Sequence, residues 1–407
     1  MSETTIVKYA ELVVKTGINL QKGQTLVITS PLECAGFARQ VAKAAYLAGA
    51  RDVVMNWNDE QFNKIRYLHA PEEVFAEFPE WRKDFYLSYA RAGAGFVSIS
   101  AADPELLQDA DPQRIALAQK TANTHLREFR ERTMNNLNAW CVISAPTEGW
   151  ARKVFPGDEK AVEKLWQAIL HSVRADRDNP VAAWEEHKRE LSRRVELLNA
   201  YRFRSLHFTN SLGTDLVVEL PEGHLWQGGS DVTRDGVEFI ANMPTEEIFT
   251  VPHKNGVSGI VFNSRPLVYN GNIIDGFSLT LKEGRIVDFS AKVGAAHLQH
   301  LLETDEGSRR FGEVALVPYD SPISQSKILF YNTLFDENAS CHFAIGRGYP
   351  GCLQNGDRMN REELIAHGCN DSLLHEDFMI GTADLQITGT TADGKQVRVF
   401  ARGNFTF

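Results

Sequence analysis

The sequence has few cysteines, no long apolar run and no excess of basic charge. Its five cysteines among 407 residues are odd in number and form no Cys-x-x-Cys pair, which excludes a disulfide scaffold and favours a reducing cytoplasm. No apolar stretch reaches the ~18–20 residues of a membrane span, and the first residues lack the pattern of a signal peptide. Basic residues number 43 against 53 acidic ones, a net charge of −10. We therefore expect neither a membrane nor a nucleic acid as partner.

Several common catalytic motifs are also missing. The sequence contains no GxxxxGK[ST] phosphate loop, no GxSxG and no HExxH. The segment Gly93-Ala94-Gly95 lacks the third glycine of the dinucleotide-binding fingerprint and precedes a strand-like run where that fingerprint requires a helix. Nothing in the sequence therefore indicates a nucleotide cofactor.

What is present is the composition of an ordinary globular protein, 43 % apolar and 24 % charged. The first half alternates helix-like and strand-like segments, a pattern typical of a mostly parallel sheet covered by helices on both faces. We predict an α/β layered domain over residues 1–200, whose boundary helix opens at Asn179-Pro180. The expected strands are 25–29, 52–57, 95–99 and 140–143, and the expected helices are 6–16, 35–48 and 112–134.

After Tyr201 the pattern changes to short strands separated by tight turns. Three hairpins are expected within residues 206–219, 277–290 and 384–401, together with one helix at 295–304. This pattern predicts an antiparallel-rich α+β domain over residues 201–407.

Acidic and imidazole side chains in this second domain stand beside apolar runs that should form its core. A buried carboxylate is costly unless it is paired or binds a metal. His375 and Asp377 are two residues apart, so in an extended segment they point to the same face. Two histidines with three or more carboxylates suit Zn²⁺, Co²⁺ or Mn²⁺, and a bridging carboxylate can hold two such ions together. The candidates are Glu246, Glu247, Glu313, His342, His375 and Asp377.

Each of these residues, taken alone, also fits a structural role. Glu313 is compatible with an ion pair to Arg309 or Arg310, and His342 with a hydrogen-bonded core histidine. Glu246-Glu247 alone fits a solvated turn or the start of a helix. Only the coincidence of all of them in one domain favours a metal site.

At these segments the sequence resembles the M29 metallo-aminopeptidases, the family of aminopeptidase T and aminopeptidase S. The likeness runs in order through the second half, and residues 14–23 followed by a strand resemble the opening of the family. Several long motifs in the right order are far more specific than any single short one. The motifs are 242–250 (NMPTEEIFT), 312–317 (GEVALV), 332–339 (NTLFDENA), 344–350 (AIGRGYP) and 375–381 (HEDFMIG).

The resemblance implies an aminopeptidase that releases N-terminal residues from peptides with a free N-terminus, using metal-activated water at a two-metal site. It further implies a cytoplasmic homodimer. The metal ligands that it implies in each chain are Glu247, Glu313, His342, His375 and Asp377, and we expect Glu313 and Asp377 to include the bridging carboxylate.

Two further residues receive catalytic roles. The catalytic tyrosine of the family matches Tyr349, which we expect to donate a hydrogen bond to the oxyanion. Glu246 resembles the general base that precedes a ligand in other two-metal aminopeptidases, a role that needs a kinked backbone because adjacent residues of an extended chain face opposite ways. The alternatives are another two-metal amidohydrolase, such as a dipeptidase or deacylase, and a catalytically silent, metal-stabilised binding protein.

Overall fold

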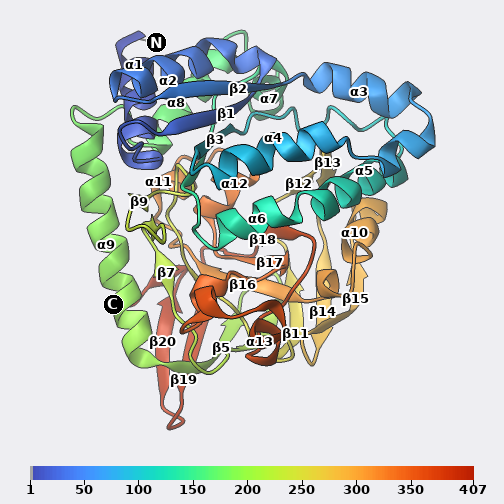
Figure 1. Ribbon diagram of the computed structural model, residues 1–407. Helices are drawn as coiled ribbons and strands as arrows, with labels where there is room; N and C mark the ends of the chain where they lie inside the picture. The colour runs from blue at the N-terminus through green and yellow to red at the C-terminus, as the bar shows by residue number, and fades with distance from the viewer. Residues whose placement is uncertain (1–2) are drawn as a thin grey trace. The chain divides into compact units, whose positions relative to one another are not determined.

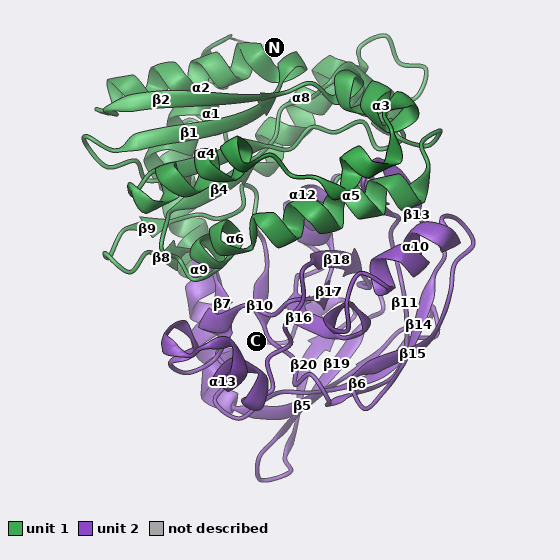
Figure 2. Ribbon diagram, turned by 45° about the vertical axis from the view of Figure 1, so that its right-hand side comes forward, with its two compact units in different colours: residues 1–189, 229–245, 330–334 green, residues 190–228, 246–329, 335–407 purple. Residues whose placement is uncertain are grey.

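The computed structural model describes residues 3–407, which form two compact units (Figures 1 and 2). Unit 1 consists of the chain up to residue 189 together with 229–245 and 330–334. Unit 2 consists of residues 190–228, 246–329 and 335–407. None of the helices in residues 3–407 combines the length and the apolar composition that crossing a bilayer requires.

Unit 1 contains a four-stranded sheet whose strands are all parallel, which confirms the predicted α/β class. The strand order is β2-β1-β3-β4, with β1 at Thr25–Pro31, β2 at Asp52–Asn58, β3 at Gly95–Ile99 and β4 at Trp140–Ile143. Helices cover both faces of this sheet (Figure 1). The helices are α1 (Glu3–Leu12), α2 (Ala35–Leu47), α3 (Glu60–His69), α4 (Glu80–Arg91), α5 (Pro112–His125), α6 (Arg127–Met134), α7 (Glu148–Val154) and α8 (Ala161–Ser172).

The helices of unit 1 differ from the expected ones in two ways. The helix predicted over 112–134 is broken at Leu126, whose φ of −93° and ψ of 12° end α5 and begin α6. Helices α3, α4, α7 and α8 were not predicted. Helix α3 buries none of its residues and α4 buries only Leu87 and Ala90, so neither has the continuous buried stripe by which a sequence pattern reveals a helix.

Unit 2 contains two large antiparallel sheets and a small one formed by β12 (Leu267–Tyr269) and β13 (Asn272–Ile274), and α9 (Pro180–Tyr201) leads into it from unit 1. The five-stranded sheet has the order β18-β17-β16-β10-β7, and the eight-stranded sheet has the order β15-β14-β11-β6-β5-β19-β20-β21. The three expected hairpins appear as β5/β6, β14/β15 and β19/β20, and the expected helix as α10 (Ala295–Leu302). The strands are β5 (Phe203–Thr209), β6 (Asp215–Glu219), β7 (Gln227–Gly228), β10 (Ile248–Thr250), β11 (Val257–Phe262), β14 (Ser278–Lys282), β15 (Arg285–Ser290), β16 (Phe311–Leu316), β17 (His342–Gly346), β18 (His375–Met379), β19 (Gln386–Thr391), β20 (Gln396–Ala401) and β21 (Asn404–Phe405).

The two sheets of unit 2 share one hydrophobic core. Aromatic side chains join them, since the ring centroids of Phe208 and Phe343 lie 5.1 Å apart and those of Phe277 and Phe378 lie 5.5 Å apart. Burying one such side chain contributes ~1.5–3 kcal/mol, so this core holds the sheets firmly together. Because side chains alternate along a strand, the other face of the five-stranded sheet is available for polar residues.

Candidate active site

The strand register of the five-stranded sheet places four predicted site residues on one face. Glu313 on β16 lies opposite Ala344 on β17, and Ala344 in turn lies opposite Asp377 on β18. Directly paired residues share a face, as do residues two apart on one strand, so His342 and His375 join them. The intervening apolar residues Phe343, Ile345 and Phe378 belong to the hydrophobic core on the other face.

A β-bulge at Gly312 turns Glu313 toward this face. Phe311 pairs with Ile345 and Glu313 pairs with Ala344, so Gly312 is the extra residue of β16. Phe311 therefore points into the core while Glu313, two residues later, points away from it. A Cβ at position 312 would lie 2.3 Å from the carbonyl oxygen of Arg347, and only glycine fits there.

Glu247 reaches the same face from the start of β10. Phe249 pairs with Ala315 of β16, which is on the face of Glu313, and Glu247 lies two residues before Phe249. Glu247 is buried. The backbone of Gly228 on β7 packs closely against it, since a Cβ at position 228 would lie 2.8 Å from the carbonyl oxygen of Glu247.

Glu247, Glu313 and His342 form the first group of possible metal ligands. The Nε2 atom of His342 lies 3.0 Å from Oε2 of Glu247 and 3.5 Å from Oε1 of Glu313. Its Nδ1 donates to the backbone carbonyls of Glu337 at 3.1 Å and Ser340 at 3.0 Å. These backbone bonds fix the ring so that Nε2 faces the carboxylates, as in metal-binding histidines.

Glu313, His375 and Asp377 form the second group, so Glu313 belongs to both. The Nε2 atom of His375 lies 3.4 Å from Oε2 of Glu313 and 3.5 Å from Oδ1 of Asp377. Its Nδ1 donates to the backbone carbonyl of Arg347 at 2.6 Å, which orients the ring. The two oxygens of Glu313 thus face one histidine each.

The charges of the site are strongly coupled because they are buried together. Burial alone would raise the pKa of Glu313, but the imidazoles of His342 and His375 outweigh it and hold that pKa at about 2. Burial alone would lower the pKa of each histidine, and the carboxylates around them raise it well above its usual value. Burial raises the pKa of Glu247.

Two buried polar atoms of the site fit a divalent cation. The Nε2 atom of His342 and the Oδ1 atom of Asp377 are buried and make no hydrogen bond with any residue in 3–407. Buried polar atoms nearly always have a hydrogen-bond partner, so two such atoms in one cluster of imidazoles and carboxylates suit coordination to a metal. The same donor set of nitrogen and oxygen suits Zn²⁺, Co²⁺ or Mn²⁺.

Tyr349 lies beside the second ligand group. Its ring packs against Phe249, with centroids 5.6 Å apart, and against the His375 ring at 5.0 Å. Burial, followed by the charges of Glu313 and Asp377, raises the pKa of Tyr349 well above its usual value, so the hydroxyl keeps its proton. The protonated hydroxyl can donate a hydrogen bond to a bound molecule.

Glu313 forms no ion pair with Arg309 or Arg310, the alternative that the sequence left open. Arg309 lies 3.9 Å from the carboxylate of Glu303, and Arg310 donates to the backbone carbonyl of Lys254 at 2.9 Å. Glu246 is buried at 5 % exposure, but neither ligand group includes it. Its backbone N–H donates to Oδ1 of Asn338 at 2.6 Å.

The sequence analysis did not single out Glu337 or Asn338. Both are buried in the 3₁₀ turn η5 (Glu337–Ala339), which contacts β18. The signal that could have found them is the polar run Asp336-Glu337-Asn338, which three residues separate from the fully buried strand β17.

Comparison with known proteins identifies the family. The model of the thermophilic metalloprotease family (M29) matches residues 2–405. Aminopeptidase 2 of Geobacillus stearothermophilus is 52 % identical over 100 % of this chain and 98 % of its own length. Aminopeptidase AmpS of Bacillus subtilis is 48 % identical over 98 % of each chain. The solved structure of AmpT from Thermus thermophilus superposes with a TM-score of 0.91 at 39 % identity, covering all of both chains. The chain therefore belongs to the M29 family of metalloproteases.

Proposed function

We propose that this protein is an aminopeptidase that removes N-terminal residues from peptides at a site holding two divalent metal ions. The observation that carries the proposal is the sharing of Glu313 between two ligand groups, each completed by one histidine and one further carboxylate. Relatives that are 52 % and 48 % identical over nearly the whole chain bear the name aminopeptidase, which supports the same reaction here.

His342 with Glu247 would hold one ion, His375 with Asp377 would hold the other, and Glu313 would bridge them. Zn²⁺, Co²⁺ and Mn²⁺ all suit this ligand set. Such ions lower the pKa of a bound water and polarise the scissile carbonyl. The backbone bonds to Nδ1 of both histidines keep the ligand atoms in place before the ions and the substrate arrive.

The remaining steps belong to Tyr349 and Glu246. The protonated hydroxyl of Tyr349 would donate a hydrogen bond to the oxygen that gains charge when the peptide carbonyl is attacked. Glu246 would accept a proton from the attacking water and deliver it to the leaving amine. Its backbone is held by Asn338, the neighbour of a residue that binds His342, so its position is tied to the ligand groups.

The proposed setting is a homodimer in the cytoplasm. All five cysteines are buried and unpaired, as expected for a protein of a reducing compartment. The substrates would be peptides with a free N-terminus.

The proposal is tested with pairs of peptides that differ only by N-terminal acetylation. Acetylation removes the positive charge of the amine and adds bulk where the first residue must sit, so the acetylated peptides should be nearly inert. The free peptides should lose one residue at a time in a time course read by mass spectrometry. Equal cleavage of both forms, or internal fragments appearing first, would instead indicate another two-metal amidohydrolase, such as a dipeptidase or deacylase.

A further inference from the structure

The strand β18 (His375–Met379) is the last strand of the five-stranded sheet, and it carries the proposed ligands His375 and Asp377. Among the strands of residues 3–407 it pairs with β17 alone, and β12, which also contacts it, pairs with β13. The last strand of a sheet presents a row of backbone N–H and C=O groups that another extended chain can bind. Because the second ligand group includes two side chains of this strand, the outer edge of β18 borders the site directly.

The hydrogen bonds between β17 and β18 show which backbone groups of β18 point outward. In an antiparallel pair, residues that bond to the partner strand alternate with residues whose N–H and C=O groups point the opposite way. Just before β18, the C=O of Leu374 accepts from the N–H of Arg347 at 2.8 Å. Just after β18, the N–H of Ile380 donates to the C=O of Cys341 at 2.8 Å, and the register between these two bonds has no bulge. The even-numbered residues of β18 therefore bond to β17, and the odd-numbered residues direct their N–H and C=O groups outward.

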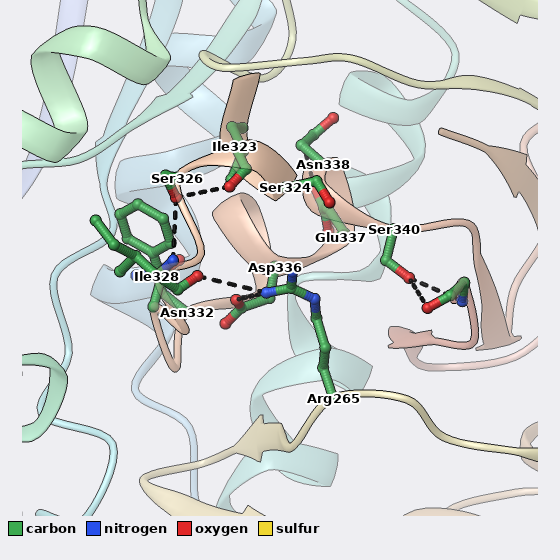
Figure 3. A network of polar contacts seen from close by, with 12 residues as sticks. Arg265, Ile323, Ser324, Ser326, Ile328, Asn332, Asp336, Glu337, Asn338 and Ser340 are labelled. Atoms are coloured by element: carbon green, nitrogen blue, oxygen red, sulfur yellow. Dashed lines mark hydrogen bonds and ion pairs between the residues drawn. The ribbon is translucent and has the colours of Figure 1, made fainter. Parts of the chain in front are cut away.

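The outer edge of β18 is accessible at one end and covered at the other. Residues 375–377 are partly exposed, whereas the last two residues of the strand are buried. The outward C=O of Met379 accepts a hydrogen bond from the N–H of Ser264 at 2.8 Å. Arg265, the next residue of that covering segment, is fixed by its ion pair with Asp336 at 3.2 Å (Figure 3). The accessible part of the edge is therefore the part that carries the two ligands.

The accessible backbone groups belong to the same residues as the ligand atoms. On the ligand face, Nε2 of His375 lies 3.5 Å from Oδ1 of Asp377 and 3.4 Å from Oε2 of Glu313. The outward backbone groups of His375 and Asp377 are therefore within one side-chain length of the second ligand group. Residues two apart on a strand are separated by ~6.6–6.8 Å, which is also the repeat of an extended peptide lying beside them.

An extended peptide substrate offers groups that complement this edge. Every second residue of an extended chain directs its N–H and C=O groups to the same side. In an aminopeptidase only one residue precedes the scissile bond, so the main chain that leads away from the ligand groups belongs to the residues after that bond. Binding through the main chain does not depend on side chains, which suits an enzyme that meets a new sequence after each residue it removes.

We propose that the main chain of the substrate residues after the scissile bond binds as an added strand to the outer edge of β18, by hydrogen bonds to the backbone of His375 and Asp377. The inference rests on the proposed aminopeptidase function and adds to it how the leaving part of the substrate is held. Such bonds keep the peptide extended and fix the scissile bond relative to the ligand groups, and this positioning supplies rate.

The first test removes single N–H groups from the substrate and measures kcat/KM of the metal-loaded enzyme. The parent peptide is leucine followed by four alanines, with a free N-terminus. Two versions are N-methylated at the third or at the fourth residue, which leaves the scissile amide unchanged. One of these two N–H groups faces the edge and the other faces away, so each version is the matched control for the other.

We expect methylation at one position to lower kcat/KM ~2–10-fold, the effect of losing one backbone hydrogen bond, with a further loss from the bulk of the methyl group. Methylation at the neighbouring position should leave kcat/KM close to that of the parent peptide. Equal losses at both positions, or no loss at either, would overturn the proposal.

The second test measures amide hydrogen exchange of the metal-loaded enzyme, resolved to single residues by mass spectrometry. The ligand is the same peptide with its first peptide bond reduced to a methylene-amine, at a concentration that fully inhibits hydrolysis. Exchange of the outward N–H of Asp377 should slow ~10-fold or more, while that of Phe378, which already bonds to β17, should stay unchanged. The strand β15, the last strand of the eight-stranded sheet, is the control for an edge without ligands, and its amides should also stay unchanged.

Unchanged exchange at Asp377, or equal slowing in β15, would contradict binding at this edge. Failure of the proposed function would appear separately, as acetylated peptides cleaved like free ones. The inference about the edge fails by itself when free peptides are preferred but the two methylated peptides do not differ.

Discussion

Replacing Tyr349 by phenylalanine separates a catalytic role of the hydroxyl from a packing role of the ring. The ring contacts with Phe249 at 5.6 Å and His375 at 5.0 Å do not involve the hydroxyl, so phenylalanine can keep both. Phenylalanine has the same ring as tyrosine, so the substitution leaves the packing of the site unchanged. The free energy of unfolding should therefore change by less than ~0.5 kcal/mol.

The effect on the reaction should be much larger. Removing one hydrogen-bond donor to an oxyanion costs ~10²–10³-fold in kcat, or about 2.7–4 kcal/mol of transition-state stabilisation. Because Tyr349 would bind the oxygen only when it carries charge, KM should change little. A loss in kcat with a nearly constant KM distinguishes this role from a contact to the substrate alone.

The assay is steady-state hydrolysis of an amino-acid p-nitroanilide by the metal-loaded enzyme, with thermal unfolding and metal content measured on the same samples. A variant that keeps more than half of its kcat would refute the oxyanion role of Tyr349. A variant that loses metal or unfolds at a lower temperature would show that the hydroxyl supports the structure of the site instead.

Three other perturbations test the site and the fold. Chelation should abolish activity and Zn²⁺, Co²⁺ or Mn²⁺ should restore it; full activity in protein shown to be metal-free by elemental analysis would contradict a metal mechanism. Glu313→Gln should lower the bound metal from two ions to one or none, because both ligand groups share this carboxylate, whereas a content of two would remove it from the bridge. In unit 1, Glu60 is partly buried, and this partial burial, followed by the charges of Glu33 and Asp103, raises its pKa from 4.5 to about 7, so stability present below pH 4.5 is lost as the pH rises through about 7. Glu60→Gln should therefore match the parent near pH 4.5 and exceed its unfolding free energy at pH 8 by at most ~3 kcal/mol, and equal stability at pH 8 would show that the pKa of this carboxyl is not raised.

Much of the fold could be predicted because its strands are apolar and its hairpins have clear turns. The valine-rich and isoleucine-rich runs of β1 to β4 appear where they were expected, as do the three hairpins of unit 2. Helices α3 and α4 escaped prediction because they bury few residues, although α8, which buries five, escaped it as well. Their positions depend on tertiary contacts that no local pattern records.

The candidate ligands could be recognised because acids and imidazoles beside apolar runs are unusual. Glu337 was different. Asp336 and Glu337 are adjacent, both acidic and both buried, and only the fold reveals that Arg265 binds one of them and leaves the other without a cation. Pairing between residues this far apart in the sequence is set by the tertiary structure and cannot be read from the local pattern.

The bulge at Gly312 shows most clearly why the fold was needed to interpret Glu313. In a regular strand Phe311 and Glu313 would share a face, and Glu313 would enter the hydrophobic core beside Phe343. The extra residue reverses this, so that one strand contributes Phe311 to the core and Glu313 to the ligand groups. The bulge in turn requires the absence of a side chain, because the carbonyl oxygen of Arg347 occupies the place of a Cβ, and that same carbonyl orients His375. A single glycine therefore couples the direction of the shared carboxylate to the orientation of the histidine that faces it.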